Sequence, residues 1–374
     1  MAQTIADDRH GAFASMTSEL HCHRQGIPNG LAQKIDLHYG ALFSSPRQLQ
    51  LSGKLSDEIW VYQSQPAASS QSIFLFECHG SDIKVLNEQI RAPASDIEQL
   101  IEYLFGRHPA VSCIDFFGLD TGKLALRRPY QRFFCAEDIV IPEYGSDLAY
   151  ADDIGKSTKR NIRRRSAALA EAYPASRFEV IEAGAITPEL VERVIAFNRS
   201  SMTRKNRTST YQDDALRLAL LAAHEGLAGT VLVDGDIVAG TVCARIGNCF
   251  YMLVTGRDFR FDAFSLGMLC CYWTARECFR RGAREINMMG GRLDYKYSLL
   301  GRSRKYDALC VYRSRTAMLR HAGRVADMAL HGACLEAKFA LLDCEREDGA
   351  AARLVARGIR AWRSAKARHR QDIA

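Results

Sequence analysis

Residues 229–255 read GTVLVDGDIVAGTVCARIGNCFYMLVT, and this stretch decides the fold. It contains three apolar runs, at 229–233, 237–244 and 249–255, which are separated by Asp234-Gly235 and by Gly247-Asn248. Aspartyl-glycine and glycyl-asparagine pairs favour the tight turns that join antiparallel strands. The stretch therefore predicts a three-stranded antiparallel meander.

Helices and further strands are expected on both sides of this meander. Apolar spacing and the breaks at proline and glycine predict four helices, at 156–173, 188–202, 213–224 and 265–281. After them we expect a strand at 284–289, a short helix at 294–300 and a last strand at 306–313. This order predicts an α/β (α+β) domain over residues 151–314, with a mixed, mostly antiparallel sheet flanked by helices.

The N-terminal part has a less regular pattern. We expect a loose leader over residues 1–30, where His21-Cys22-His23 has no second ligand pair nearby and so does not predict a metal site. Residues 31–150 predict a small ββαββ unit, with strands near 72–78, 83–86, 111–117 and 132–141 and a helix at 95–107.

Composition and charge exclude several classes of protein. The 374 residues are 47% hydrophobic and 25% charged, which excludes wholesale disorder. No apolar run has the ~18–20 residues that cross a membrane, and the N-terminus lacks the apolar core of a signal peptide, so we expect a cytoplasmic protein. The 12 cysteines include no C-x-x-C pair, and we expect them to be reduced.

The net charge of +7 is concentrated in one place. Residues 353–370 contain seven arginine and lysine side chains and no acidic one, so the rest of the chain is neutral. This distribution argues against a nucleic-acid groove over the whole body. A second basic run at 156–165 is either an anion contact or a solvated helix face, because its charges fall on most sides of the helix.

The start of the helix at 265–281 is a candidate anion site. A helix N-terminus has N–H groups without an internal partner, and its dipole favours negative charge there. Here those donors belong to Leu266, Gly267, Met268 and Leu269, and Arg257 and Arg260 in the preceding loop add positive charge. Gly267 would let a pyrophosphate approach the backbone, or would merely permit close packing of the helix on the sheet.

Four stretches, taken in order, resemble the GNAT acyltransferase superfamily, and within it the FemAB-like branch that includes the CelD type. They are KSTKRNIRRR (156–165), VDGDIVAGTV (233–242), FSLGML (264–269) and NMMGGRLDYK (287–296). The resemblance implies tandem GNAT-like halves, with a degenerate half at 31–150 and the transferase half at 151–314. It also implies acyl-CoA as co-substrate and no metal. The pyrophosphate would lie at Ser265–Leu269, and the pantetheine arm in the splay between strand 249–255, which contains Val254, and strand 284–289.

The same resemblance suggests catalytic residues. Tyr297-Ser-Leu-Leu-Gly301 is similar to a Tyr-x-x-x-Gly stretch of the superfamily, whose tyrosine often protonates the CoA sulfur, although an aromatic side chain that only packs on the sheet is equally consistent. Asp294 or Glu285 could take the proton of the nucleophile, and Asp294 could instead cap the short helix. Lys296 matches a lysine of this branch that would contact a substrate anion, or it is solvated.

The C-terminal tail, residues 315–374, lies beyond the resemblance and is expected to be helical. In 351–370, Val355, Ile359 and Trp362 form one apolar stripe on a basic helix, which fits an anionic membrane surface, an RNA backbone, or packing on the body.

Together these patterns predict an acyl-CoA-dependent N- or O-acyltransferase that acts on an amine or hydroxyl of a small-molecule or cell-envelope and polysaccharide-related acceptor. Two alternatives stay open: a FemAB-type transferase that uses aminoacyl-tRNA, and a GNAT-like binding module without catalysis.

Overall fold

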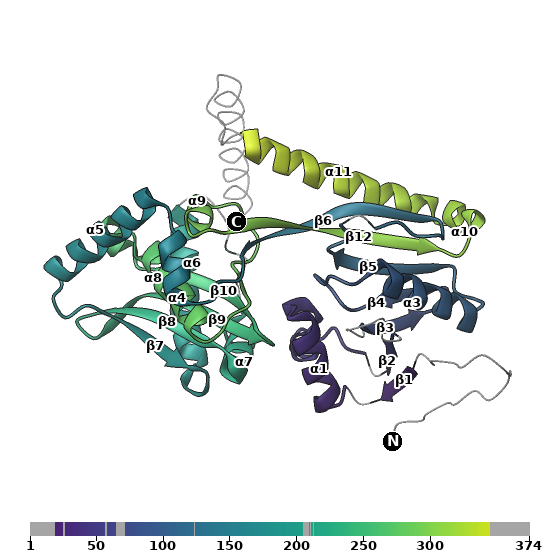
Figure 1. Ribbon diagram of the computed structural model, residues 1–374, viewed down its shortest axis with the longest axis horizontal. Helices are drawn as coiled ribbons and strands as arrows, with labels where there is room; N and C mark the ends of the chain where they lie inside the picture. The colour runs from purple at the N-terminus through teal and green to yellow at the C-terminus, as the bar shows by residue number, and fades with distance from the viewer. Residues whose placement is uncertain are drawn as a thin grey trace, which may run out of the picture. The chain divides into compact units, whose positions relative to one another are not determined.

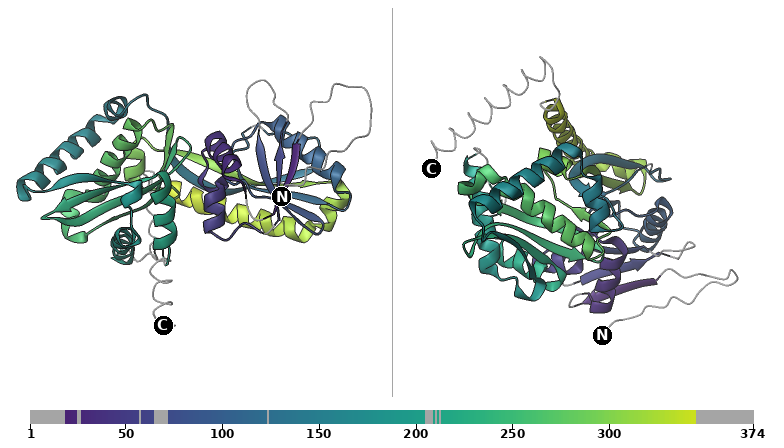
Figure 2. Two further views of the ribbon diagram at one scale, coloured as in Figure 1. Left: turned by 90° about the horizontal axis from the view of Figure 1, so that it is seen from below. Right: turned by 60° about the vertical axis from the view of Figure 1, so that its left-hand side comes forward.

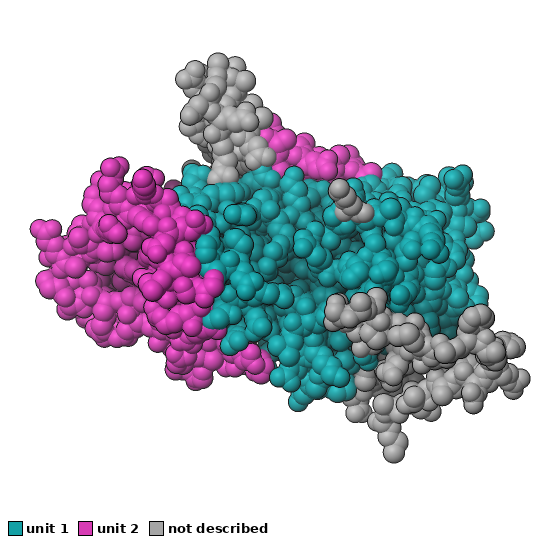
Figure 3. Space-filling model, viewed as in Figure 1, with its two compact units in different colours: residues 1–144, 245–251, 282–328 teal, residues 145–244, 252–281, 329–374 magenta. Residues whose placement is uncertain are grey.

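A computed structural model describes residues 19–24, 27–56, 58–64, 72–122, 124–204, 209, 211 and 213–344. Its contacts divide the chain into two compact units, coloured separately in Figure 3. Unit 1 contains residues 1–144, 245–251 and 282–328, and unit 2 contains 145–244, 252–281 and 329–374. Both units are therefore discontinuous in sequence, whereas the predicted halves were continuous ranges.

Unit 1 is built on a mostly antiparallel sheet (Figure 1). Its strands are β1 (Glu19–Arg24), β2 (Glu58–Gln63), β3 (Ile73–His79), β4 (Asp82–Val85), β5 (Cys113–Leu119), β6 (Tyr130–Ile141), β11 (Glu285–Asn287) and β12 (Arg302–Tyr312). They follow one another in the order β1-β2-β3-β4-β5-β12-β6-β11. β12 thus lies between β5 and β6 and pairs antiparallel with both.

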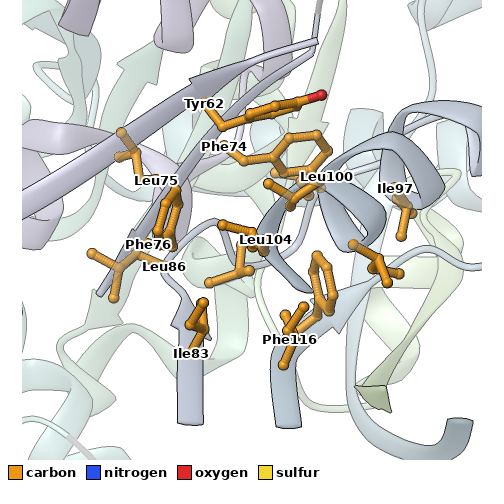
Figure 4. Close-up of a cluster of buried hydrophobic side chains, with 14 of the residues drawn as sticks. Tyr62, Phe74, Leu75, Phe76, Ile83, Leu86, Ile97, Leu100, Leu104 and Phe116 are labelled. Atoms are coloured by element: carbon orange, nitrogen blue, oxygen red, sulfur yellow. The ribbon is translucent and has the colours of Figure 1, made fainter. Parts of the chain in front are cut away.

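The helices of unit 1 cover this sheet. They are α1 (Asn29–Tyr39), α2 (Pro46–Leu51), α3 (Ala94–Arg107), α9 (Asp294–Ser298) and α10 (Arg315–Arg320). α3 was predicted from its apolar spacing, and Ile97, Leu100 and Leu104 are indeed buried. They point toward side chains of the adjacent strands such as Phe76 and Phe116 (Figure 4), in the core that fixes the sheet.

The structure of residues 19–51 differs from the prediction. Glu19–Arg24, expected to lie in a loose leader, forms β1 and pairs with β2 at the edge of the sheet. α1 and α2 were not predicted. α1 follows Pro28 and has no side-chain hydrogen bond at its N-cap, so the sequence lacks the usual signal for a helix start.

Unit 2 contains the predicted meander. β8 (Leu227–Val233), β9 (Asp236–Ile246) and β10 (Cys249–Arg257) follow one another in the sheet, and β7 (Arg177–Glu182) pairs with β8 at its edge. β9 and β10 cross the unit boundary, and Cys249–Tyr251 of β10 pairs parallel with β11 inside unit 1. The turns at Asp234 and Gly247 have positive φ, as the predicted hairpins require.

The helices of unit 2 are α4 (Asp147–Asp153), α5 (Lys156–Ala172), α6 (Pro188–Arg204), α7 (Ala215–Glu225) and α8 (Leu266–Arg280). α8 packs against β8 and β7, where the rings of Trp273 and Phe178 lie 5.5 Å apart in a tilted arrangement. Figure 2 shows the same helices and strands from two further sides. The predicted α/β class, with a mostly antiparallel sheet flanked by helices, is confirmed.

A last helix, α11 (Ala322–Cys344), follows α10. It agrees with the helical tail that the sequence predicted up to about residue 342. The basic stripe at 351–370 lies outside the described residues. No helix in the described part of the chain is both long enough and apolar enough to span a membrane.

Candidate functional site

The start of α8 provides part of the backbone geometry that the predicted anion site requires. Ser265 precedes the helix with φ 55° and ψ 39°, a left-handed conformation, and its side chain makes no capping hydrogen bond. Its carbonyl accepts from the N–H groups of Met268 and Leu269 at 3.0 and 3.2 Å. Of the four predicted donors, two are thus used by Ser265. Leu266 and Gly267, the first two residues of the helix, carry the N–H groups that point outward at its end.

Arg257 lies directly beside this helix start. Its Nε donates to Asp262 Oδ1 at 3.0 Å, which fixes the guanidinium. A Cβ placed on Gly267 would lie 3.3 Å from Arg257 Cδ, so the glycine and the arginine are in contact. Helix end, glycine and arginine therefore form one concentrated positive site in unit 2.

Arg260 is arranged differently. Its Nε and Nη2 donate to Asp258 Oδ2 at 2.9 and 2.6 Å, and its side chain is 72% exposed. The same contact holds the pKa of the Asp258 carboxyl below its usual value. Arg260 thus fixes the loop before α8, and its contact with a phosphate stays a prediction.

Val254, on β10, is buried. The carbonyls on either side of it are tied down, because Tyr211 donates to the carbonyl of Leu253 and Asn198 Nδ2 donates to that of Thr255 at 2.8 Å. β10 is therefore held firmly just before the loop that carries Arg257. A contact of Val254 with a pantetheine arm stays a prediction.

The predicted catalytic residues all belong to unit 1, with Glu285 on β11 and Asp294 and Tyr297 on α9. Glu285 opens β11, and each of its oxygens accepts from Arg304, at 2.8 and 2.7 Å. This ion pair raises the pKa of Arg304. Both oxygens of Glu285 therefore already accept a charged hydrogen bond, and the assignment of the base to Asp294 or Glu285 stays a prediction.

Asp294 is exposed and is the first residue of α9, whose N-cap is Leu293. The alternative interpretation of Asp294 as the cap of this helix is therefore wrong. Its carboxylate lies in the first turn, where the positive end of the helix favours it.

Lys296 is buried, with 4% of its surface exposed, so the interpretation as a solvated lysine is wrong. Its ammonium donates to the carbonyls of Met288 at 2.6 Å, Met289 at 3.0 Å and Gly290 at 2.7 Å. An ammonium has three donors, and these contacts use all three. Lys296 therefore organises the turn that follows β11, and a contact with a substrate anion stays a prediction.

Tyr297 follows Lys296 in α9 and is partly buried. The helix ends through Leu300, which has φ 68°, and through the Gly301 N–H, which donates to the Lys296 carbonyl at 2.9 Å. A Cβ on Gly301 would lie 2.4 Å from Ile139 Cγ2 and 2.7 Å from the Lys296 carbonyl oxygen. The spacing from Tyr297 to Gly301 thus has a steric cause: only glycine fits where this turn meets β6.

Sequence analysis missed a buried polar cluster beside this turn. Glu137 accepts two hydrogen bonds from Arg292 Nε, at 3.0 and 3.1 Å, and one from Arg292 Nη2, at 2.5 Å. On the same strand Asp138 accepts from Asn287 Nδ2 at 2.9 Å, and burial raises the pKa of Asp138. Arg292 and Asn287 belong to the quoted stretch 287–296, but their partners lie about 150 residues earlier, beyond any local pattern.

One group of residues has ligand atoms close enough for a metal ion: Cys113, Asp115 and Cys310, in unit 1. Arg324 already forms an ion pair with Asp115. The neighbouring Cys310 thiol and burial raise the pKa of Cys113, which opposes the thiolate that a metal requires. Cys113 and Cys310 are better explained as part of the core cluster that includes Tyr312 and Ala317, and Asp115 as the partner of Arg324.

The basic residues of α5 divide into two groups, those that contact unit 2 and those that are exposed to solvent. Lys159 donates to the Asp152 carbonyl at 2.8 Å and Arg165 donates to the Ala263 carbonyl, so these two are engaged with the unit itself. The other four are exposed and fall within an arc of about 100° on the helix, at spacings of four, seven and eight residues. They are Lys156, Arg160, Arg163 and Arg164. The structure thus gives α5 a single cationic face, which the sequence pattern did not predict.

Comparison with known proteins gives one family match and several structural likenesses. Residues 156–297 match the acetyltransferase (GNAT) domain family. No curated protein sequence matches the chain. The solved structure of FemX has 9% identity over 76% of this chain and 96% of that chain, with a TM-score of 0.51.

Two further structures cover most of the chain with lower scores. A conserved protein of unknown function from Bacteroides thetaiotaomicron has 15% identity, coverage of 78% and 99%, and a TM-score of 0.48. L-PGS from Bacillus licheniformis has 12% identity, coverage of 81% and 97%, and a TM-score of 0.44. At these identities the likeness to FemX concerns the fold alone. The match of residues 156–297 to this family supports a transferase of the GNAT acyltransferase type.

Proposed function

We propose that the protein transfers an acyl group from acyl-CoA to an amine or hydroxyl of a small-molecule or cell-envelope and polysaccharide-related acceptor. The observation that carries this proposal is the start of α8, where Gly267 lies against Arg257 and Asp262 fixes the guanidinium. Backbone N–H groups at a helix end, together with an arginine, are what a pyrophosphate requires. A Cβ at Gly267 would meet only the Arg257 side chain, so these residues fit such a ligand.

In this proposal each site residue has one role in binding acyl-CoA or in transferring the acyl group. Leu266 and Gly267 would donate N–H groups to the pyrophosphate, and Arg257 would add a charged contact. The thioester supplies the electrophilic carbonyl when acyl-CoA is bound. Asp294 would take the proton from the attacking amine or hydroxyl, directly or through water, as the new bond to the acyl carbon forms. Tyr297 would donate a proton to the thiolate as the carbon–sulfur bond breaks.

Binding tests this proposal before any acceptor is known. We expect acetyl-CoA or a longer acyl-CoA to raise the melting temperature, because a ligand at ~100 times its Kd adds about 2.7 kcal/mol of stability. Gly267→Glu should abolish the shift by placing a carboxylate at the helix end. Gly184→Glu is the matched control, since Gly184 is exposed and a Cβ there meets nothing within 4 Å. No shift at any acyl length would favour the two alternatives, transfer from an aminoacyl-tRNA or a GNAT-like binding module without catalysis.

A second candidate, transfer from an aminoacyl-tRNA, is supported by the cationic face of α5. Lys156, Arg160, Arg163 and Arg164 would contact phosphates of the RNA, as the FemAB-like resemblance implies. The affinity for RNA falls steeply with salt. The logarithm of the binding constant falls by about 0.7–0.9 per phosphate contacted for each unit of log salt concentration, whereas CoA binding at a single pyrophosphate changes less. A steep salt slope for tRNA that falls in Arg160→Gln/Arg163→Gln would favour this candidate. Tight CoA binding with no tRNA affinity would exclude it.

The predicted basic helix at 351–370 has a separate proposed role. We propose that it attaches the enzyme to an anionic membrane surface. Unchanged sedimentation with anionic vesicles after removal of residues 351–374 would contradict this role.

A further inference from the structure

Unit 1 contains a cavity of about 600 Å³ that none of the preceding roles uses. β12 contributes residues 302–305 and Asp307 to its wall, and β6 and the segment after it contribute Arg132, Val140 and Pro142. The loop after β5 and Arg91 close the remaining side. The volume lies in the range of about 300–1,000 Å³ that is typical of small-molecule sites.

The lining carries an excess of positive charge. Five cationic side chains, those of Arg91, Arg132, Arg302, Arg304 and Lys305, face two carboxylates. The two carboxylates are already paired: Asp120 accepts from Arg91 at 2.7 Å, and Asp307 lies 3.6 Å from Arg132.

Two of the cations have no such partner. Arg302 and Lys305 are exposed, and neither forms an ion pair with any residue in the described ranges. Lys305 lies over the Phe134 ring at 6.0 Å, a contact that leaves its charge available. The cavity thus presents two uncompensated positive charges, three positions apart on β12.

The remaining wall is fixed before any ligand arrives. Arg304 is held through both terminal nitrogens by Glu285, and Asp307 accepts from the Thr121 hydroxyl at 2.7 Å. Ser303, between the cations, donates to Glu137, the partner of Arg292. β12 therefore links the cavity directly to the buried cluster beside α9. A preformed site of this kind loses little freedom on binding.

We infer that this cavity binds a phosphate-bearing group, and that the group belongs to the acceptor. Arginine matches phosphate through paired N–H donors, and each phosphate carries about −1.5 to −2 charges near neutral pH. The two uncompensated positive charges of Arg302 and Lys305, beside three paired arginines, suit a diphosphate better than a single carboxylate. Val140 and Pro142 give the attached group an apolar surface. Binding itself stands without the transferase reaction, but its assignment to the acceptor rests on the proposed function.

Calorimetry on the full-length protein with inorganic pyrophosphate tests the binding directly. In the Gly267→Glu background, which removes the proposed pyrophosphate site at α8, we expect saturable 1:1 binding at low salt, stronger than that of orthophosphate. Arg302→Gln/Lys305→Gln should weaken it about tenfold or more, whereas the matched pair Arg315→Gln/Lys84→Gln, exposed cations outside the cavity, should not. All four positions are exposed, so unchanged melting temperatures without ligand would show that the variants fold. Absent binding, or equal binding in the cavity variant, overturns the inference.

Two further measurements distinguish a lipid phosphate from a soluble one, and a failure of this inference from a failure of the proposed function. Sedimentation with phosphatidylglycerol vesicles but not phosphatidylcholine vesicles, lost in Arg302→Gln/Lys305→Gln, would identify a lipid headgroup. Binding of free pyrophosphate without vesicle binding would identify a soluble phosphorylated acceptor. If pyrophosphate binds this cavity while no acyl-CoA shifts the melting temperature, the transferase proposal fails and the site stands. The reverse result overturns the cavity inference and leaves the transferase proposal intact.

Discussion

Arg292 donates to Glu137 from both Nε and Nη2, and the two side chains are only 7% and 1% exposed. A charge pair this deeply buried is costly to break, because removing one partner leaves the other charge without compensation. The pair joins β6 to the segment between β11 and α9. It therefore fixes the position of the turn that carries Asp294 and Tyr297.

Arg292→Leu should destabilise the protein by about 3–5 kcal/mol, since Glu137 would keep its buried charge with no charged partner. The change is measured as the free energy of unfolding in urea. Arg91→Leu is the control, because Arg91 is 81% exposed in its pair with Asp120. We expect that surface change to have little effect on stability. A similarly small effect for Arg292→Leu would contradict the buried-pair interpretation.

Asp138→Asn should make stability depend differently on pH. Burial raises the pKa of Asp138, so the folded state holds a proton that the unfolded chain releases above its ordinary pKa near 3.9. The free energy of unfolding therefore falls as the pH rises through that window. We expect the variant to gain stability relative to the wild type between about pH 4 and about pH 7. Urea midpoints of both proteins at the two pH values measure the difference, and a difference independent of pH would refute the prediction.

Gly301→Ala should destabilise the turn after α9. Its Cβ would lie 2.7 Å from the Lys296 carbonyl, which is backbone and cannot move aside cheaply. We expect a loss of about 1–3 kcal/mol, as for other overpacked sites. Gly145→Ala is the control, because a Cβ there meets nothing within 4 Å and Gly145 has no positive φ. Equal melting temperatures for the two variants would argue against a steric requirement at Gly301.

Lys296→Met should separate positioning from simple stability. The carbonyls of Met288 and Gly290 would lose this donor, at about 1–3 kcal/mol for each buried acceptor left unpaired, whereas the Met289 carbonyl would keep the N–H of Ile139. We expect lower stability and, once an acceptor is known, a lower kcat with little change in acyl-CoA affinity, since the α8 site shares no residue with this turn. Lys84→Met, on an exposed position of β4, should change neither quantity. Loss of acyl-CoA binding with kcat retained would contradict the positioning role.

Local signals in the sequence predicted most elements of the fold. The meander followed from Asp234-Gly235 and Gly247-Asn248, and α3 from apolar spacing, because each signal lies inside the element that it specifies. β12 was predicted only from residue 306, yet it begins at Arg302, since its first four residues are polar or charged and become strand by pairing with β6. Tertiary pairing overrides local propensity there.

The candidate site was predictable only where it is a backbone feature. The start of α8 and the turn from Tyr297 to Gly301 could be placed from glycine positions and helix boundaries. Three other features could not be predicted from the sequence: the contact of Lys296 with three carbonyls, the Glu137–Arg292 pair and the cationic cavity. Each depends on which strands become neighbours, and the sequence alone does not state that β12 enters between β5 and β6.

The place of β12 has a consequence for how the chain is made. β5 and β6 leave the ribosome early, but the strand that fills the gap between them follows only after residues 142–301 have also been synthesised. At about 5–20 residues per second, this delay is on the order of 10–30 s. During it, two unpaired strand edges are open to other nascent chains and to chaperones. A fragment that stops at residue 144 would keep these strand edges unpaired permanently. Unit 1 is therefore completed only when the late part of the chain has been synthesised.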